Sequence, residues 1–419
     1  MAAQTQTGQA DIVVIGAGII GLACALRLQH DGLKVALVDR AGAGHGASFG
    51  NAGHIATEQI YPLASPQVVR GALSTLMDAE GALRIRPQYI LHILPWLARF
   101  LWASRPSAFS RGIVALSTLQ STAAADLNAL LAGANAAQLL RMDGHLVIVE
   151  RESSLVSARR ETEELAKYGV HADWLDADQV RQIAPDIATP IQGAYLYRGT
   201  GHVEDPLAVC QALFAALLKA GGQFSCSQIE RVTHSAQQFT AHGAGGVRIT
   251  AKRVLLAAGA WSAPIAAQFG YTVPLDTERG YHLTLPRAQP AFRIPVASYE
   301  RKVIMTPMSC GLRMTGTVEF GGLDLPPDER RFDLLHKHMH ALLPDADKAG
   351  VSTWMGFRPS LPDHLPVIGK APDGREIYFA FGHQHLGVTL AGVTARLISE
   401  LLRSDVTPRT LEAFRISRF

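Results

Sequence analysis

Residues 11–39, DIVVIGAGIIGLACALRLQHDGLKVALVD, contain the pattern that decides the fold. An apolar run at 12–15 leads directly into Gly16-Ala17-Gly18-Ile19-Ile20-Gly21, and an apolar-rich helical pattern then extends to Leu28. A second apolar run at 35–38 ends in Asp39. The stretch predicts a strand, a glycine turn, a helix and a second strand that ends in a carboxylate.

Each part of this unit has a physical role in binding a dinucleotide. Gly16 permits the tight turn, Gly18 lets the backbone approach a pyrophosphate, and Gly21 lets helix and strand pack closely. The helix N-terminus offers unpaired N–H groups and a positive dipole end to the phosphates. Asp39 would accept hydrogen bonds from an adenosine ribose, and its charge would oppose a 2′-phosphate. We therefore predict a bound dinucleotide.

The apolar run at 12–26 also invites a reading as a membrane span or a secretory signal. It is short for a span, which needs about 20 residues. The preceding MAAQTQTGQA lacks the positive charge of a secretory signal. We expect a cytoplasmic protein.

Composition narrows the class of protein. The 419 residues suggest two domains or two interleaved ones. Hydrophobic residues make up 48% and charged residues 18%, which is typical of a well-buried enzyme. The net charge is +3 without a basic stripe, so nucleic acid is not an expected partner. The cysteines have no metal or redox spacing and are expected to be reduced thiols: Cys24, Cys210, Cys226 and Cys310.

The rest of the chain alternates between helical and strand patterns. Asp205 and Pro206 are suited to cap and start a helix that runs to about Ala220. Other helices are expected at 89–102, where Pro95 is a potential break, 113–132, 152–168 and up to 403. Strands are expected at 144–149, 254–257, 282–285 and 303–306.

Several further motifs, together with the opening unit, resemble the D-amino-acid oxidase and dehydrogenase family of FAD flavoproteins over essentially the whole chain. They are Gly46–Gly53, Ala258–Trp261, Gly316–Glu319, Gly356–Pro359 and Gly382-His383. The loop from Ser48 to Gly53 is most similar to bacterial D-amino-acid dehydrogenases. Arg279–His282 resembles relatives that act on D-hydroxyproline-type cyclic amino acids.

The resemblance implies an α/β fold in which a Rossmann-like FAD-binding domain is interleaved with a second, α+β domain. The second domain is built on an antiparallel sheet that roofs the flavin. The expected FAD-binding segments are 11–56, 200–280 and 351–419. The expected substrate-binding segments are 57–199 and 281–350.

Small residues and one helix start are the expected cofactor contacts. The 46–53 loop lets backbone approach a flat ring, and Ser48 and Asn51 add hydrogen bonds; a flexible surface loop is the alternative. The helix beginning near Gly387 would point its N-terminus at the flavin, with Thr389 capping it or donating a hydrogen bond; an ordinary loop-to-helix junction is the alternative. The full expected set is Gly16, Gly18, Ile19, Ile20, Gly21, Asp39, Arg40, Ala47, Ser48, Asn51, Ala52, Gly53, Ala258, Gly259, Trp261, Gly382, His383, Leu386, Gly387, Val388 and Thr389.

Arg358 is the expected substrate anchor, because a planar two-pronged donor suits a carboxylate; a surface ion pair is the alternative. Tyr281 or His282 is a second candidate, and strand alternation makes it unfavourable for both to face the site; a core tyrosine is the alternative. His385 and His383 are candidates for flavin or substrate contact.

The trio His336, His338 and His340 invites a metal reading. On a helix only His336 and His340 share a face, and neither an acid nor a cysteine completes the set. We expect a solvated face and no metal site.

The predicted reaction is hydride transfer from the substrate Cα–H to flavin N5, with a neutral amine and no obligatory side-chain base. The favoured substrate is a cyclic D-amino acid such as cis-4-hydroxy-D-proline or D-proline. A glycine or sarcosine oxidase and a broad D-amino-acid dehydrogenase are the near alternatives. A nicotinamide enzyme and a non-catalytic flavin scaffold are the remote ones.

The electron acceptor stays open among oxygen, a quinone and a redox protein. The 89–102 helix carries Trp96, Trp102 and Arg99, with Arg105 just beyond it, and could lie on the inner face of the cell membrane near a quinone pool. A core helix explains the same spacing, and we favour the core helix.

Overall fold

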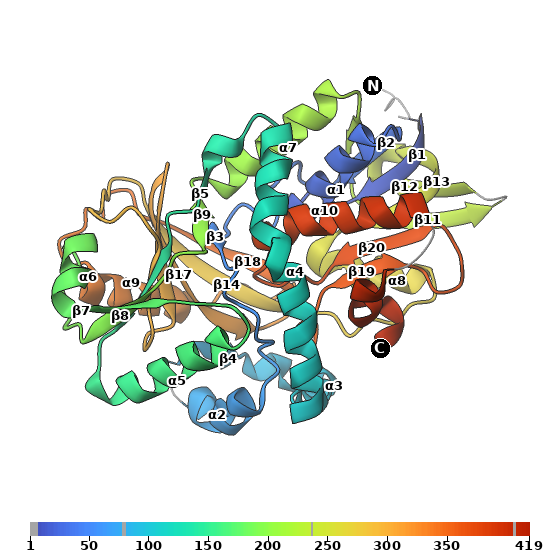
Figure 1. The fold of residues 1–419 in the computed structure, drawn as a ribbon. Helices are drawn as coiled ribbons and strands as arrows, with labels where there is room; N and C mark the ends of the chain where they lie inside the picture. The colour runs from blue at the N-terminus through green and yellow to red at the C-terminus, as the bar shows by residue number, and fades with distance from the viewer. Residues whose placement is uncertain (1–6, 78–80, 236–237, 405–407) are drawn as a thin grey trace.

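The computed structural model describes residues 7–77, 81–235, 238–404 and 408–419. Two sheets form the two halves of the molecule, and the opening and closing parts of the chain lie in the same half (Figure 1). A three-stranded sheet of β3 (His54–Ile55), β9 (Gly201–Val203) and β5 (Leu140–Arg141) lies between them in Figure 1.

The first sheet is built on the predicted dinucleotide unit. β1 (Thr7–Ile15) pairs in parallel with β2 (Val35–Asp39) on one side and with β13 (Arg248–Leu256) on the other. These strands are apolar because both faces of the sheet are covered. The other strands are β10 (Gln223–Cys226), β11 (Ile229–Ser235), β12 (Gln238–Gly243), β19 (Val367–Lys370) and β20 (Ile377–Phe381).

Helices α1 (Ile19–His30) and α10 (Gly387–Ser404) lie side by side on one face of this sheet (Figure 1). α4 (Pro106–Gly133) packs on α10, and α7 (Pro206–Lys219) packs on α1. A Cβ on Gly392 would lie 2.3 Å from the Asp126 backbone, so this glycine allows α10 and α4 to approach closely. In this arrangement the N-termini of α1 and α10 point toward the interior of the molecule.

The second sheet is mainly antiparallel, as expected, with parallel pairing only of β15 with β6 and of β17 with β4 among the described strands. Its centre is β14 (Asp276–Leu285), paired antiparallel with β17 (Gly311–Phe320) and β18 (Ser352–Ser360). The rest are β4 (Leu83–Ile85), β6 (His145–Val149), β7 (Asp173–Asp176), β8 (Gly193–Tyr197), β15 (Val296–Ser298) and β16 (Val303–Met308). Thus β18 belongs to the second sheet, although 351–419 are expected in the FAD-binding domain; the domain limits stay a prediction.

The remaining helices, apart from α8, lie in the second half. They are α2 (Pro66–Met77), α3 (Ile90–Ala103), α5 (Leu155–Ala166), α6 (Ala177–Ile183), α8 (Ser262–Gln268), which packs by the first sheet, and α9 (Glu329–Leu342). The predicted cap is confirmed, since the Asp205 carboxylate accepts a hydrogen bond from the Leu207 amide at 2.8 Å. The break at Pro95 is wrong, because α3 continues through it.

Two other expectations about exposure are corrected. α3 is not a core helix: only Ile93 and Trp96 are buried, whereas Leu91 is 83% exposed and Trp102 is 66% exposed. On α9, His336 and His340 are exposed as expected, but His338 is buried beside Arg301. For α3 the periodicity predicted a helix correctly but did not show what lies against each face; α9 was not among the predicted helices.

Candidate active site

A cavity of about 1210 Å³ runs between the glycine turn of the first sheet and the underside of the second sheet. It receives the ends of β1 and β2, the loop after β2, the starts of α1 and α10, and strands β14 and β18. Residues from many separate stretches of the chain therefore share one space.

The opening turn is shaped by its glycines. Gly16 has a φ of +108°, and a Cβ there would lie 2.3 Å from the Ala257 carbonyl oxygen. A Cβ on Gly21 would lie 1.9 Å from the Gly16 carbonyl oxygen. These contacts bring α1 close to β1 and β13, and they leave the start of α1 facing the cavity.

Polar groups hold the turn in place. The Ile19 amide donates to Ser48 Oγ at 3.0 Å, so a loop residue caps α1 from outside the helix. Asp39 accepts hydrogen bonds from the amides of Ala17 at 2.8 Å and Ala41 at 2.7 Å. A carboxylate has about four lone-pair sites, so Asp39 retains capacity for a ribose hydroxyl.

The structure brings most of the expected cofactor residues to the cavity. Those that line it are Gly16, Gly18, Ile19, Ile20, Asp39, Arg40, Ala47, Ser48, Asn51, Ala52, Ala258, Gly259, Trp261, Gly382, His383, Gly387 and Val388. The Arg40 guanidinium lies 3.5 Å over the Trp261 ring, which joins two of these segments.

Four expected residues lie behind the cavity wall: Gly21, Gly53, Leu386 and Thr389. Thr389 is fully buried, and its hydroxyl accepts a hydrogen bond from the Ala56 amide at 3.0 Å. It therefore fixes β3 to α10, and the cavity receives Gly387 and Val388 from this helix start instead.

Arg358 lines the cavity from β18, and its guanidinium makes neither a hydrogen bond nor an ion pair with another residue in the described ranges. It lies across Gly280 of the neighbouring strand, where a Cβ would come within 2.4 Å of Nη2. Burial lowers the pKa of Arg358, with Glu278 acting in the opposite direction. A desolvated guanidinium without a protein partner is suited to bind an anion.

Tyr281 and His282 are not brought to the cavity. The Tyr281 hydroxyl lies in the core of the second half, where it donates to Glu319 and accepts from the Asp328 amide. His282 Nδ1 lies 3.0 Å from the Gly50 carbonyl oxygen, and its ring stacks on Trp354. Tyr281 therefore stabilises the core of the second half, and His282 joins the second sheet to the 46–53 loop.

His383 and His385 do line the cavity. His383 Nε2 lies 3.0 Å from Thr394 Oγ1, and His385 Nε2 contacts Gln59 Oε1. Burial lowers the pKa of each histidine to about 3, so both rings are neutral near pH 7.

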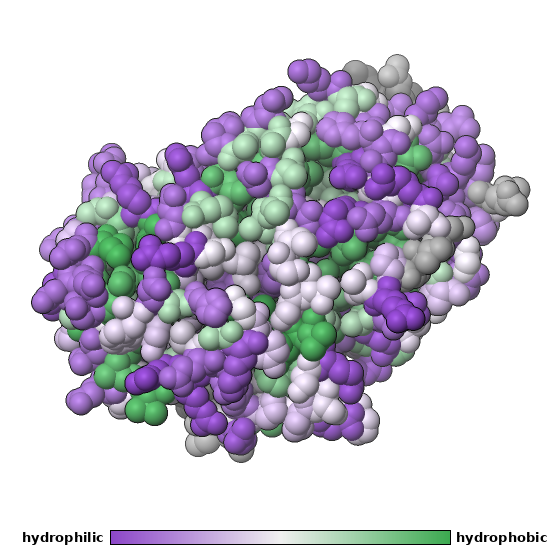
Figure 2. Space-filling model, viewed as in Figure 1, coloured by the Kyte–Doolittle hydropathy of each residue, from purple (hydrophilic) through white to green (hydrophobic). Residues whose placement is uncertain are grey.

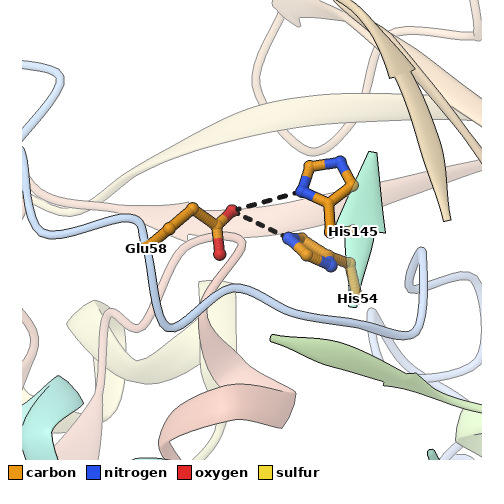
Figure 3. A group of neighbouring side chains, drawn as sticks. All are labelled: His54, Glu58 and His145. Carbon is orange, nitrogen blue, oxygen red and sulfur yellow. Dashed lines mark hydrogen bonds and ion pairs between the residues drawn. The ribbon is translucent and has the colours of Figure 1, made fainter. Parts of the chain in front are cut away.

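Sequence reasoning missed a buried polar group in the same cavity: His54, Glu58 and His145 (Figure 3). His145 is far along the chain from the other two, so spacing could not join them. His54 directly follows the Gly46–Gly53 motif, and this adjacency is the one available signal.

Comparisons with known proteins agree with this architecture. A family model described as FAD dependent oxidoreductase matches residues 11–401. A D-amino-acid oxidase of Bradyrhizobium diazoefficiens is 30% identical over 417 residues, covering 97% of this chain and 98% of that protein. A D-amino acid dehydrogenase of Vibrio vulnificus is 27% identical over 402 residues, covering 94% and 96%.

Solved structures share the fold. Glycine oxidase from Geobacillus kaustophilus matches with a TM-score of 0.74 at 21% identity, covering 98% of this chain and 99% of that one. L-proline dehydrogenase from P. horikoshii matches with a TM-score of 0.70 at 17% identity, covering 99% and 98%.

The cavity wall also fits FAD. A Cβ on Gly46 or Gly259 would meet no protein atom within 4 Å, so these positions open into the space that the family's cofactor requires. The α1 N-terminus, the Asp39 carboxylate and the small-residue loop supply donors and acceptors for a dinucleotide. The chain therefore belongs to the DAO family of FAD-dependent oxidoreductases.

Proposed function

We propose that this enzyme oxidises D-amino acids, with Arg358 binding the substrate carboxylate. The support is that a half-buried guanidinium, without an ion pair or hydrogen bond to any described residue, lies in the wall of the cavity that fits FAD. Curated relatives that span nearly the whole chain are named D-amino-acid oxidase and D-amino acid dehydrogenase.

The chain's own residues would orient the substrate and keep the site dry. Arg358 would bind the substrate carboxylate, and the lack of a side chain at Gly280 leaves room for the guanidinium. The His385 ring is polar but neutral, so it would not compete with Arg358 for the substrate carboxylate. FAD, when bound, would supply the acceptor for the hydride from Cα, and the start of α10, which lines the cavity, would offer a positive dipole end to it.

Within the D-amino acids we favour cyclic secondary amines, D-proline and cis-4-hydroxy-D-proline. This choice rests on the resemblance of Arg279–His282, of which only Gly280 lines the cavity. Glycine and sarcosine, which are smaller, are the comparison substrates.

The test is anaerobic mixing of the purified holoenzyme, in separate samples, with D-proline, cis-4-hydroxy-D-proline, D-alanine, glycine, sarcosine and L-proline. We expect loss of the visible flavin absorption with the D-amino acids, fastest with the cyclic pair. Bleaching by glycine or sarcosine alone would reassign the enzyme, and bleaching by none of them would remove the proposed function.

We also propose that α3 binds to an anionic lipid surface. A quinone in that membrane would then accept the electrons from the reduced flavin. Its side chains Ile90, Leu91, Leu94, Leu101 and Trp102 are exposed. Residues 87–125 contain three arginines and neither aspartate nor glutamate, so the charge of this segment complements anionic headgroups. Arg105 lies over the Trp102 ring at 3.2 Å, where it pairs the two groups that favour the interface.

α2 and α3 lie together at the lower edge of Figure 1. The face drawn in Figure 2 is hydrophilic over most of its periphery, with green groups in smaller patches. Within the described ranges, none of the helices has the length and apolarity needed to cross a bilayer. A surface contact through α3 is consistent with both observations.

Co-sedimentation with lipid vesicles tests this contact. We expect binding to phosphatidylglycerol vesicles about tenfold tighter than to phosphatidylcholine, and weaker in high salt. Leu91→Glu with Trp102→Glu should abolish it, whereas Val156→Glu, at an 80%-exposed position on α5, should not. Equal binding by all three proteins would contradict the proposal, as would reduction of oxygen but not of a quinone.

A further inference from the structure

The His54–Glu58–His145 cluster is buried, polar and incompletely hydrogen-bonded. The three residues are 8%, 8% and 5% exposed, and they come from β3, the turn after it and the start of β6. All three line the same cavity as Arg358. Buried polar groups normally have partners, so the free atoms of this cluster need an explanation.

Hydrogen bonding defines the charge of His54 and Glu58. His54 Nε2 lies 2.8 Å from Glu58 Oε1, and Nδ1 lies 3.0 Å from the Gly201 carbonyl oxygen. Both partners accept when Glu58 is ionised, so this geometry has both ring nitrogens of His54 donating. His54 then forms an ion pair with the Glu58 carboxylate; burial acts to raise the pKa of Glu58, but His54 lowers it below its ordinary value.

Three polar atoms remain free at this pair. Neither nitrogen of His145 nor Oε2 of Glu58 has a hydrogen-bond partner among the described residues. His145 Nδ1 is 3.8 Å from Glu58 Oε1, and Figure 3 shows both contacts of Glu58 reaching the same oxygen while the other stays free. Burial lowers the pKa of His145 to about 3, so its ring is neutral, with one nitrogen that donates and one that accepts.

The charge balance selects the kind of ligand. The ion pair cancels and His145 is neutral, so a charged group entering here would be left without compensation in a buried place. A hydroxyl matches the free atoms, because it can donate to Glu58 Oε2 and accept from the His145 N–H. A divalent cation is disfavoured, since the His54 Nε2 lone pair would be available only after loss of the proton that bonds Glu58.

The cluster lies in the same cavity as the expected carboxylate anchor, and so does His385. Gln59, next to Glu58, contacts His385. His385 lies near enough to both groups to experience the charges of Arg358 and of Glu58. A substrate held at one end by Arg358 can therefore extend past His385 toward the cluster.

We propose that His54, Glu58 and His145 form a subsite for a hydroxyl group on the substrate side chain or ring. Glu58 and His145 contact the hydroxyl, and His54 positions Glu58. The inference rests on the proposed function, because Arg358 provides the other end of the substrate. It defines the substrate class as hydroxylated amino acids.

Matched substrate pairs that differ by one hydroxyl test the subsite. The holoenzyme is assayed with D-proline and cis-4-hydroxy-D-proline, and with 2-aminobutyrate and homoserine in their D forms. We expect the hydroxylated member of at least one pair to have a kcat/KM about tenfold higher or more. In Glu58→Gln and His145→Leu this ratio should fall toward one. His338→Leu, a buried histidine outside the cavity, should keep it.

A binding measurement separates this inference from the proposed function. Butyrate, 3-hydroxybutyrate and 4-hydroxybutyrate have no amine to oxidise, and their binding is followed by the spectrum of the bound flavin. A hydroxybutyrate should bind about fivefold tighter than butyrate, and the gain should disappear in Glu58→Gln. If D-amino acids fail to bleach the flavin but this gain is present, the proposed function falls and the subsite stands.

Two results would overturn the subsite. One is an absence of hydroxyl preference in both substrate pairs and in the binding series. The other is a stoichiometric metal ion in the purified holoenzyme that is lost in His145→Leu. Where His145→Leu does not retain FAD, His145→Asn replaces it in each comparison.

Discussion

At the scale of single residues, Arg358, the proposed carboxylate anchor, has an environment that reduces stability. Its guanidinium is desolvated, its pKa is lowered by burial, and it lacks an ion-pair partner among the described residues. Such a group costs free energy until an anion binds it. Sequence reasoning identified this residue from its motif, but its lack of a partner could be seen only in the folded chain.

Replacement of Arg358 should separate activity from stability. Arg358→Met should lower kcat/KM for D-amino acids by a factor of about 30 or more, since about 2–5 kcal/mol of charged hydrogen bonding is lost. The unfolding temperature should stay level or rise, because the desolvation cost disappears. Steady-state kinetics and thermal unfolding of the same preparation measure both. A clear fall in the unfolding temperature would show that Arg358 has a structural partner.

Gly280 is expected to be essential for the position of Arg358. In Gly280→Ala the new Cβ would lie within 2.4 Å of Nη2 and displace the guanidinium. We expect a large rise in KM with retained FAD. Gly199→Ala is the control, since a Cβ there meets nothing within 4 Å. Normal kinetics in Gly280→Ala would mean that Arg358 can bind the substrate from another rotamer.

At the scale of elements, the local sequence predicts the first strand–helix–strand unit well, but it does not predict which residue caps the helix of that unit. The residue that precedes α1 is Gly18, which has no side chain to cap the helix, and Ser48 supplies the acceptor from a loop. The expected role of Ser48 was a hydrogen bond to the cofactor. Its Oγ is directed at the Ile19 amide, so it shapes the turn that would bind the phosphates.

Loss of this cap should weaken the fold and the cofactor site together. Ser48→Ala is expected to lower the free energy of unfolding by about 0.5–2 kcal/mol and to raise the dissociation constant of FAD. Denaturation of the apoprotein and FAD titration by fluorescence measure the two effects. Ser157→Ala, at an exposed hydroxyl on α5, provides the comparison. Unchanged values in both assays would show that water replaces the hydroxyl fully.

At the scale of the whole molecule, buried histidines connect stability to pH. The pKa values of His145, His282, His383 and His385 are all lowered to about 3, with burial as the largest cause. Their ordinary value is 6.5. Above pH 6.5 they are neutral in both states. As the pH falls below 6.5, the unfolded chain takes up protons that the native protein does not bind, so stability decreases toward pH 3.

A single substitution should reduce this acid sensitivity. In His282→Phe the aromatic stacking on Trp354 can remain while one titrating group is lost. Between pH 6 and 4 we expect the fall in unfolding free energy to become shallower by about 1.4 kcal/mol per pH unit. Urea denaturation across this range measures it, with the exposed His30→Phe as control. An identical slope in wild type and His282→Phe would contradict the account.

The sequence by itself determined the parts of this protein whose physics is local. The glycine turn, its strands and helix, the Asp205 cap and most cavity-lining small residues follow from spacing and backbone geometry within short segments. Whether Tyr281, His282 and α3 face a cavity, a core or solvent was decided only by the tertiary structure, because that depends on which distant segments pack against them. For the same reason the meeting of His54, Glu58 and His145 became visible only in the folded chain, where β3 and β6 come together around one cavity.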